Sequence, residues 1–336
     1  MCTLFPACYI DLPDGTPSRR APFYLSMEEY IARQLPTGTY LFSWILPPTV
    51  VMGRNQIAHQ EFDLDFCQQH HIDVVRRKSG GGAIFADEHN VMWSLITPGG
   101  AVEPIFADYS RHIAAALETL GVQTEVSGRN DILIQGGGKV CGNAFYHLPQ
   151  RNIVHGTMLY DTQAELMQGA LKPDLKKLQE KGVKSVRSRI SLLKDYLSIS
   201  LEEVCRRLRT QLCDRSICLT EKDVKAIENI AAGYDDPDYL YGHSAHSDVS
   251  CQGRIAGCGT LELHFELKGS LISGIAMHGD YFETSPAQEA FENAFIPCPF
   301  TRQALRQAVA THHPEQSIRG LSEEALVRLL EDSTEL

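Results

Sequence analysis

Four short segments with the composition of β-strands crowd together between residues 122 and 160, and they limit the folds open to this chain. We predict these strands at Val122–Val126, Asp131–Gln135, Lys139–His147 and Ile153–Tyr160. A helical pattern at Asp108–Leu120, stopped by Gly121, directly precedes them. Strands in clusters, with helices between the clusters, favour an α+β domain with a mixed or antiparallel sheet. The strict strand–helix alternation of a doubly wound fold is missing.

The remaining elements extend the same pattern. A capping box at Ser26–Glu29 predicts a helix that begins there and runs to about Gln34. Further strands are predicted at Tyr40–Leu46, Thr49–Met52, Ile72–Arg77 and Asn90–Ile96, and further helices at Leu201–Leu212 and Thr220–Ala232. A polar stretch at 233–250 precedes a strand pair, Arg254–Leu267 with Leu271–His278, and three helices. We therefore expect a large domain at residues 1–242 and a small α+β accessory domain at residues 243–336.

Composition excludes several classes of protein. The net charge of −11 argues against a general nucleic-acid binder, because affinity for the phosphate backbone comes mainly from lysine and arginine. The most apolar early stretch, Tyr40–Met52, is interrupted by two prolines and is too short to span a bilayer. There is no pattern of a secretory signal at the N-terminus. We expect a cytoplasmic protein, a monomer without membrane or nucleic-acid partners.

A run of three glycines follows a basic pair at the end of one predicted strand. The stretch reads Arg76-Arg77-Lys78-Ser79-Gly80-Gly81-Gly82-Ala83-Ile84-Phe85. Consecutive glycines cost backbone entropy on folding, so they indicate a geometric need such as close approach of backbone N–H groups to an anion. A glycine-rich hairpin with solvated basic residues is the alternative that this stretch alone leaves open.

A second basic feature lies at Lys172–Lys194, which holds eight basic residues and two acidic ones. In an acidic protein such a segment produces a local positive field that favours an anionic ligand or partner, although a solvated basic helix has the same composition.

The two common nucleotide-binding sequence motifs are absent. No Gly-x-Gly-x-x-Gly follows a strand, and Val140 follows Gly138-Lys139 where a phosphate-binding loop has Ser or Thr.

Lys139 is the best single candidate for catalysis, because it follows three glycines and opens a predicted strand. A fixed ammonium can bind a carboxylate and a phosphate together. Strict alternation predicts Cys141 on the same face as Lys139, with His155 on the neighbouring strand, so a Cys141 acyl carrier is a second possibility. Asp131 follows a turn and is suited either to that turn or to Mg²⁺ beside a triphosphate.

The ten cysteines have irregular spacing, and we treat most of them as buried apolar residues. One arrangement has ligands for zinc, formed by His243, His246, Cys251 and Cys258. The gap between its cysteines is loose for a structural zinc site, so we predict no metal there.

Taken together, the motifs resemble the lipoate–protein ligase A family of the biotin/lipoate ligase superfamily. The blocks stand in family order over most of the chain: Arg76–Phe85, Gly128–Ile132, Lys139–Ala144, His155–Leu159, Lys172–Arg189 and Gly279–Phe282. Three positions depart from the family pattern. Ala86 replaces a common His, His89 replaces a common Gly, and Cys141 replaces the usual Ser. The octanoyltransferases of the superfamily carry a catalytic Cys upstream of the lysine strand, and residues 129–131 contain none.

The resemblance implies a catalytic domain similar to class II synthetases. It implies that ATP with Mg²⁺ converts lipoate to lipoyl-AMP, and that the lipoyl group then passes to a lysine of an apo lipoyl domain. The partners so implied are acyltransferase subunits of 2-oxoacid dehydrogenases and the glycine-cleavage H protein. Lys139 is the implied catalytic residue. The implied binding residues are Arg76, Arg77, Ser79, Gly80, Gly81, Gly82, Ala83, Ile84, Phe85, Asn90, Asp131, Lys139, His155 and Lys184.

Three alternatives remain open at this point. One is an ATP-independent octanoyl or lipoyl transferase that uses Cys141 as its acyl carrier. Another is a catalytically silent protein that binds lipoyl domains. A biotin ligase shares the architecture, but its glycine-rich nucleotide motif is not found in this chain.

Overall fold

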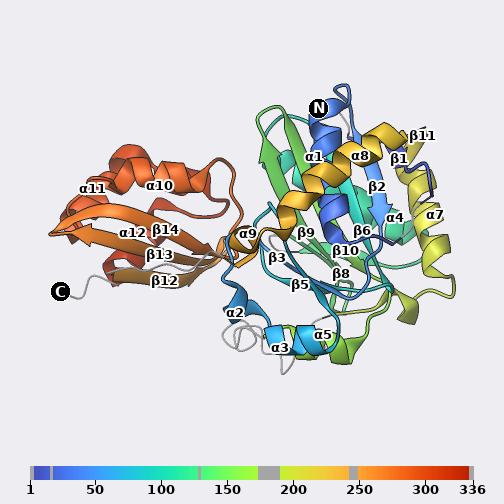
Figure 1. The fold of residues 1–336 in the computed structure, drawn as a ribbon, viewed down its shortest axis with the longest axis horizontal. Helices are drawn as coiled ribbons and strands as arrows, with labels where there is room; N and C mark the ends of the chain where they lie inside the picture. Colours follow the sequence, from blue (N-terminus) through green and yellow to red (C-terminus); the bar gives the residue numbers. More distant parts are fainter. Residues whose placement is uncertain (1–3, 16–17, 128–129, 173–189, 242–248, 333–336) are drawn as a thin grey trace. The chain divides into compact units, whose positions relative to one another are not determined.

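The structure is a computed structural model that describes residues 4–15, 18–127, 130–172, 190–241 and 249–332 (Figure 1). The chain forms two compact units. The first unit comprises residues 1–52, 59–77 and 83–240, and the second comprises residues 53–58, 78–82 and 241–336. Two short stretches from the N-terminal half of the chain, 53–58 and 78–82, therefore belong to the second unit.

The first unit is built on an eight-stranded mixed sheet. Its strand order is β11 (Cys213–Cys218), β1 (Ala7–Asp11), β2 (Tyr40–Trp44), β6 (Asn90–Pro98), β10 (Arg151–Leu159), β9 (Lys139–Leu148), β8 (Asp131–Ile134) and β7 (Thr124–Ser127). Strand β1 runs parallel to β2 and β11, and every other neighbouring pair is antiparallel. The prediction of a mixed α+β fold is confirmed. The edge strand β11 was not predicted, because its exposed polar residues lack the alternation by which strands are recognised.

A second, three-stranded sheet has the order β4 (Asp73–Arg76), β3 (Thr49–Met52) and β5 (Ile84–Ala86). Helices accompany both sheets: α1 (Ala21–Gln34), α2 (Ala58–Glu61), α3 (Leu64–Gln69), α4 (Val102–Thr119), α5 (Ala164–Ala170), α7 (Leu201–Leu212), α8 (Glu221–Ala231) and α9 (Pro237–Tyr241). Within the described part of the first unit, 3₁₀ turns lie at Leu193–Asp195 and Ala232–Asp235. No described helix is long and apolar enough to cross a membrane.

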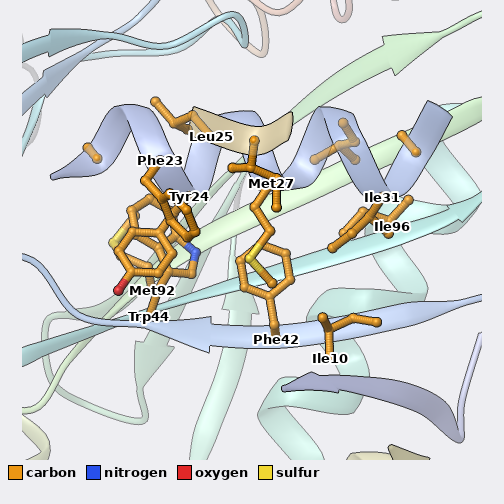
Figure 2. Close-up of a cluster of buried hydrophobic side chains, with 14 of the residues drawn as sticks. Ile10, Phe23, Tyr24, Leu25, Met27, Ile31, Phe42, Trp44, Met92 and Ile96 are labelled. Atoms are coloured by element: carbon orange, nitrogen blue, oxygen red, sulfur yellow. The ribbon is translucent and has the colours of Figure 1, made fainter. Parts of the chain in front are cut away.

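Helix α1 covers one face of the large sheet and forms much of the core there. Tyr24 stacks on Trp44 of β2 with ring centroids 4.9 Å apart. Met27 and Ile31 of α1 belong to the same buried cluster (Figure 2). Helix α4 covers the opposite face, where its Phe106 contacts a phenylalanine of β9. The two helices therefore bury both sides of the central strands.

The predicted start of α1 is wrong. The helix begins at Ala21 rather than at Ser26, and Ser26 is fully buried inside it. Pro22 occupies the first turn, where its missing N–H costs no hydrogen bond, so the residues before the Ser26–Glu29 pattern already favour a helix start. Helix α8 begins with a capping box, in which the Thr220 and Asp223 side chains bond reciprocally to each other's backbone.

The second unit packs three helices on an antiparallel sheet. The strands are β12 (Val249–Ile255), β13 (Gly259–Lys268) and β14 (Leu271–Gly279), and the helices are α10 (Ala287–Phe295), α11 (Arg302–His312) and α12 (Glu323–Asp332), with a 3₁₀ turn at Pro314–Ser317. The single strand predicted at Arg254–Leu267 is wrong. A turn at Gly257, whose φ of 80° favours glycine, divides it into the ends of β12 and β13.

Candidate active site

Lys139 forms an ion pair with Asp131 across neighbouring strands. Lys139 opens β9 and Asp131 opens β8, and 2.8 Å separates the lysine Nζ from the aspartate Oδ1. Both side chains are partly exposed, at 32% and 21%. The ammonium is therefore fixed by a carboxylate while remaining within reach of a ligand.

A β-bulge sets the direction of the Lys139 side chain. Ile132 pairs with Cys141, but the next residue, Leu133, pairs with Lys139, so β9 has one extra residue at this point. Such a bulge re-aims the side chains beside it. Because Ile132 and Leu133 point to opposite faces of the sheet, their partners Cys141 and Lys139 do so as well.

The prediction that Cys141 and Lys139 share a face is therefore wrong, because simple alternation does not hold through the bulge. Cys141 instead lies on the α4 side and is only 2% exposed. Burial raises the pKa of its thiol to about 12, with Lys139 acting weakly in the opposite direction. A buried thiol with a raised pKa lacks the thiolate that a nucleophile needs.

The C-terminal part of the basic segment pairs with the backbone of Lys139. Ile190 forms a parallel bridge with Lys139, and the Ser191 N–H donates to the Lys139 carbonyl at 2.9 Å. The Ser191 Oγ accepts from the Gly138 N–H at 2.7 Å. Most of the basic segment itself, Lys184 included, lies outside the described residues. The end of the basic segment is thus hydrogen-bonded to the strand that carries the candidate catalytic lysine.

His155 is buried and oriented by a carboxylate. Its Nδ1 lies 2.9 and 3.0 Å from the two carboxylate oxygens of Glu28, which belongs to α1. Ser94 donates to the same carboxylate, and the Trp44 indole N–H donates to Ser94 at 2.8 Å. These four side chains form a continuous polar network inside an apolar layer.

Glu28 was not predicted as a functional residue. The misplaced start of α1 hid the signal, because a helix from Ala21 sets Glu28 on the same stripe as Tyr24 and Ile31, both of which are buried. A charged residue on the apolar stripe of a helix indicates a buried polar partner.

Asn90 is held by a buried aspartate that was also not predicted. The Asp87 Oδ1 accepts from the Asn90 side-chain amide at 3.1 Å and from the His89 N–H at 3.0 Å. The other Asp87 oxygen accepts from Thr162 and from the Gln163 N–H. The Asn90 Oδ1 is buried and has no hydrogen-bond partner among the described residues. It is an acceptor in position for a ligand donor.

Strand pairing places four of the predicted residues on one face of the large sheet. Asn90 pairs with Leu159, which lies on the His155 face of β10. Asp131 pairs with Gly142, which pairs in turn with a residue of that same face of β10. The bulge brings Lys139 to this side. Lys139, Asp131, Asn90 and His155 therefore share the face that α1 partly covers.

The two arginines before the glycine run are both buried. Arg76 donates to the Leu240 carbonyl through Nε at 3.1 Å and Nη2 at 2.7 Å, and Arg77 donates to the Val51 carbonyl at 3.0 Å. Burial lowers the pKa of each guanidinium to about 10, and for Arg77 the Glu28 carboxylate acts in the opposite direction. Arg76 has contacts typical of a structural residue. Arg77 interacts electrostatically with Glu28, which belongs to the His155 network.

The glycine run belongs mainly to the second unit. The Gly81 N–H donates to the Tyr281 carbonyl at 3.2 Å, and a Cβ added at Gly80 would lie 2.2 Å from the same oxygen. Gly81 itself has a φ of 88°. Ser79 is buried beside this contact, and Gly82 is partly exposed. Close backbone approach is the geometric need expected for Gly80, but the approaching group in this structure is protein backbone.

The last two residues of the motif form part of the small sheet. Ala83 directly precedes β5, Ile84 pairs with Val51, and Phe85 pairs with Val50 and is buried. Ala86, where the family commonly has His, packs in the core of the first unit. Of the arrangement considered for zinc, Cys251 and Cys258 are buried in the core of the second unit, and both histidines lie outside the described residues.

Comparison with known families identifies relatives of this chain. Residues 20–213 match the model of the lipoyl protein ligase A/B catalytic domain, and residues 244–330 match that of the bacterial lipoate protein ligase C-terminus. Lipoate–protein ligase 1 of Staphylococcus aureus is 30% identical over 315 residues, which cover 91% of this chain and 95% of that protein. Lipoate-protein ligase LplJ of Bacillus subtilis is 32% identical over 293 residues, which cover 84% and 88%.

Solved structures share the fold. The LipL1 structure of P. falciparum, in complex with lipoate, superposes with a TM-score of 0.78 at 16% identity and covers 97% of this chain and 98% of that one. A bipartite lipoate protein ligase of Thermoplasma acidophilum, described with its E2 lipoyl domain, gives 0.63 at 23% identity and covers 72% and 99%. A lipoate-protein ligase A bound with ATP gives 0.61 at 22% identity and covers 70% and 99%. With both family models matched in order, this chain belongs to the lipoate–protein ligase family and is a ligase.

Proposed function

We propose that this protein uses ATP and Mg²⁺ to convert lipoate into lipoyl-AMP and pyrophosphate. It then transfers the lipoyl group to a specific lysine of an apo lipoyl domain. The observation that carries the proposal is the Lys139 ammonium, held beside Asp131 on the sheet face that also bears Asn90 and His155.

In the first step, a carboxylate oxygen of lipoate attacks the α-phosphorus of ATP, and the bond from that phosphorus to pyrophosphate breaks. Both reacting groups are anionic, so their approach is unfavourable unless a cation bridges them. Lys139 supplies that cation. Each charge-assisted hydrogen bond that it makes contributes about 1.5–3 kcal/mol.

Asp131 fits the ion that accompanies ATP. Its carboxylate is partly exposed, and carboxylate oxygens are the protein ligands that Mg²⁺ prefers. Bound with ATP, Mg²⁺ neutralises charge on the phosphates. Because the same carboxylate pairs with Lys139, Asp131 also keeps the ammonium near the phosphate whose charge it offsets.

The resemblance to the family supports roles for the other predicted residues. The apolar strands β6 and β9 supply part of the slot for the dithiolane chain. Arg77 and the backbone at Gly82–Phe85 bind the nucleotide, and the basic segment with Lys184 excludes water from the adenylate. A mixed anhydride hydrolyses readily, so water exclusion has a chemical purpose.

In the second step, the amine of the acceptor lysine attacks the lipoyl carbonyl carbon. The new C–N bond forms, the C–O bond to AMP breaks, and the amine loses a proton. The partners are lipoyl domains of 2-oxoacid dehydrogenase acyltransferases or the glycine-cleavage H protein. The archaeal relative, whose structure is described with its E2 lipoyl domain, supports this partner class.

The test is a complete reaction with each component omitted in turn. The protein is incubated with ATP, Mg²⁺, a lipoate/octanoate mixture and an apo lipoyl domain, and the domain is weighed by mass spectrometry. We expect a lipoyl mass increase that requires ATP, together with lipoate-dependent exchange of pyrophosphate into ATP. Modification of the domain without ATP would overturn the proposal and favour the transferase mechanism.

The burial and raised pKa of Cys141 do not support that transferase alternative. A silent lipoyl-domain binder would give neither the mass increase nor the exchange, so the same reaction distinguishes all three functions.

A further inference from the structure

Gly142 stands near the start of the ten-residue strand β9, a position where glycine is unfavourable. A glycine inside a strand has no side chain to pack and loses more conformational freedom than other residues on folding. Its φ lies outside the left-handed region, so the backbone there does not require glycine. The remaining reason for a glycine is space.

The Lys139 side chain occupies that space. A Cβ built on Gly142 would lie 2.3 Å from the Lys139 Nζ and 2.5 Å from its Cε. Both distances are far inside van der Waals contact, so the lysine side chain lies directly over the bare backbone of Gly142. Any side chain at residue 142 would force the ammonium to move.

The pairing of the strands explains why this position matters. Gly142 lies opposite Asp131 on β8, and the bulge turns Lys139 toward the same face. The ammonium thus lies over Gly142 and reaches the Asp131 Oδ1 at 2.8 Å. The bulge aims the lysine, Gly142 provides room for it, and Asp131 holds its end.

We propose that Gly142 is a positioning residue for the Lys139 ammonium, and that the ammonium lies in the space that a side chain at residue 142 would fill. This inference rests on the role given to Lys139 under the proposed function. Gly142 acts through the lysine, so its effect should disappear when the lysine side chain is removed.

The test is a double-mutant cycle in the full chain with Gly142→Ala and Lys139→Ala. In the wild-type background, Gly142→Ala should reduce lipoate-dependent ATP–pyrophosphate exchange about a hundredfold, since displacement of a catalytic group by 1 Å has an effect of that order. It should also lower the Tm relative to its effect in the Lys139→Ala background. In the Lys139→Ala background the alanine has no lysine to displace, so Gly142→Ala should leave the Tm unchanged or raise it.

Gly156→Ala is the matched control. A Cβ at Gly156 would lie 1.9 Å from the Asn143 Oδ1, so this substitution is also crowded, but by a different side chain. Its effect on the Tm should be equal in the presence and absence of the Lys139 side chain. If the Tm effect depends on Lys139 for Gly142→Ala but not for Gly156→Ala, the contact between Gly142 and Lys139 is specific.

Two results would overturn the inference. One is a wild-type exchange rate in Gly142→Ala, and the other is an equal fall in Tm in both backgrounds. If Gly142→Ala fails to fold, recovery of folding in the double variant supports the inference and continued failure rejects it. If the wild-type protein shows no lipoate-dependent exchange, the proposed function fails, while the Tm cycle still decides the contact.

Discussion

At the scale of single residues, the role proposed for the Lys139–Asp131 pair is catalytic, and the pair contributes little to folding. Both side chains are partly exposed, and ion pairs in such settings stabilise proteins by about 0.2–1 kcal/mol. An ammonium between two anionic reactants, in contrast, is worth several kcal/mol in the transition state. Substitution of Lys139 should therefore lower activity and leave the free energy of unfolding nearly unchanged.

We expect Lys139→Ala to reduce lipoate-dependent ATP–pyrophosphate exchange about a thousandfold, which corresponds to the loss of about 4 kcal/mol in the transition state. Urea unfolding should change by less than about 1 kcal/mol. Arg306→Ala is the control, because Arg306 also forms a partly exposed ion pair, with Glu331 at 2.6 Å. Normal exchange by the Lys139 variant would remove this residue from the mechanism.

Cys141 gives the complementary prediction. Because burial raises the pKa of this thiol to about 12, from an ordinary value of 9.0, its thiolate is scarce at any pH below that value. Iodoacetamide should therefore leave Cys141 unmodified in the folded protein from pH 7 to 9, and should modify it after unfolding. Cys141→Ser should retain adenylate formation. Loss of all acyl transfer in that variant, or rapid labelling in the folded state, would instead indicate an acyl carrier.

At the scale of elements, strand and helix identity could be predicted more reliably than the details that build the site. Alternation and turn residues are local, so the paired strands of the large sheet and the α7 start at Leu201 were predictable. The bulge that separates Lys139 from Cys141 depends on the pairing of β8 with β9, which one segment of sequence does not contain. The buried place of Glu28 depends likewise on which strands α1 covers.

The network around Glu28 can be tested as a unit of the α1–sheet contact. Glu28→Ala should leave His155 and Ser94 without their shared acceptor, at a cost of about 1–3 kcal/mol for each buried group left unsatisfied. Glu28→Gln should cost less, since it keeps the shape and one acceptor. Urea unfolding measures both.

Glu29→Gln is the control for this pair of variants. The neighbouring carboxylate bonds to the exposed Arg33, so its loss should cost less than about 1 kcal/mol. Equal destabilisation by Glu28→Ala and Glu29→Gln would show that the buried network contributes nothing specific to folding.

At the scale of the whole molecule, the glycine motif divides between the two units. Arg76, Arg77 and residues 83–85 of the motif belong to the first unit, whereas residues 78–82 belong to the second. The Tyr281 carbonyl, in a motif 200 residues further along the chain, accepts from Gly81 and leaves no room for a side chain at Gly80. Two blocks of the family pattern that are remote in sequence are therefore in direct contact. Neither block alone indicates the other as its partner.

Gly80→Ala should weaken the second unit. The added methyl group meets a backbone oxygen at 2.2 Å, and overpacking of this kind costs about 1–3 kcal/mol. Both tryptophans, Trp44 and Trp93, lie in the first unit, so their fluorescence reports on that unit while far-ultraviolet circular dichroism reports on both. The expected result is a circular dichroism transition at lower urea than the fluorescence transition, with the fluorescence midpoint unchanged. Gly233→Ala, whose methyl group meets no atom within 4 Å, should leave both transitions together. If the two transitions of Gly80→Ala coincide at the wild-type midpoint, the loop at residues 78–82 is free to move away from Tyr281 and the prediction is wrong.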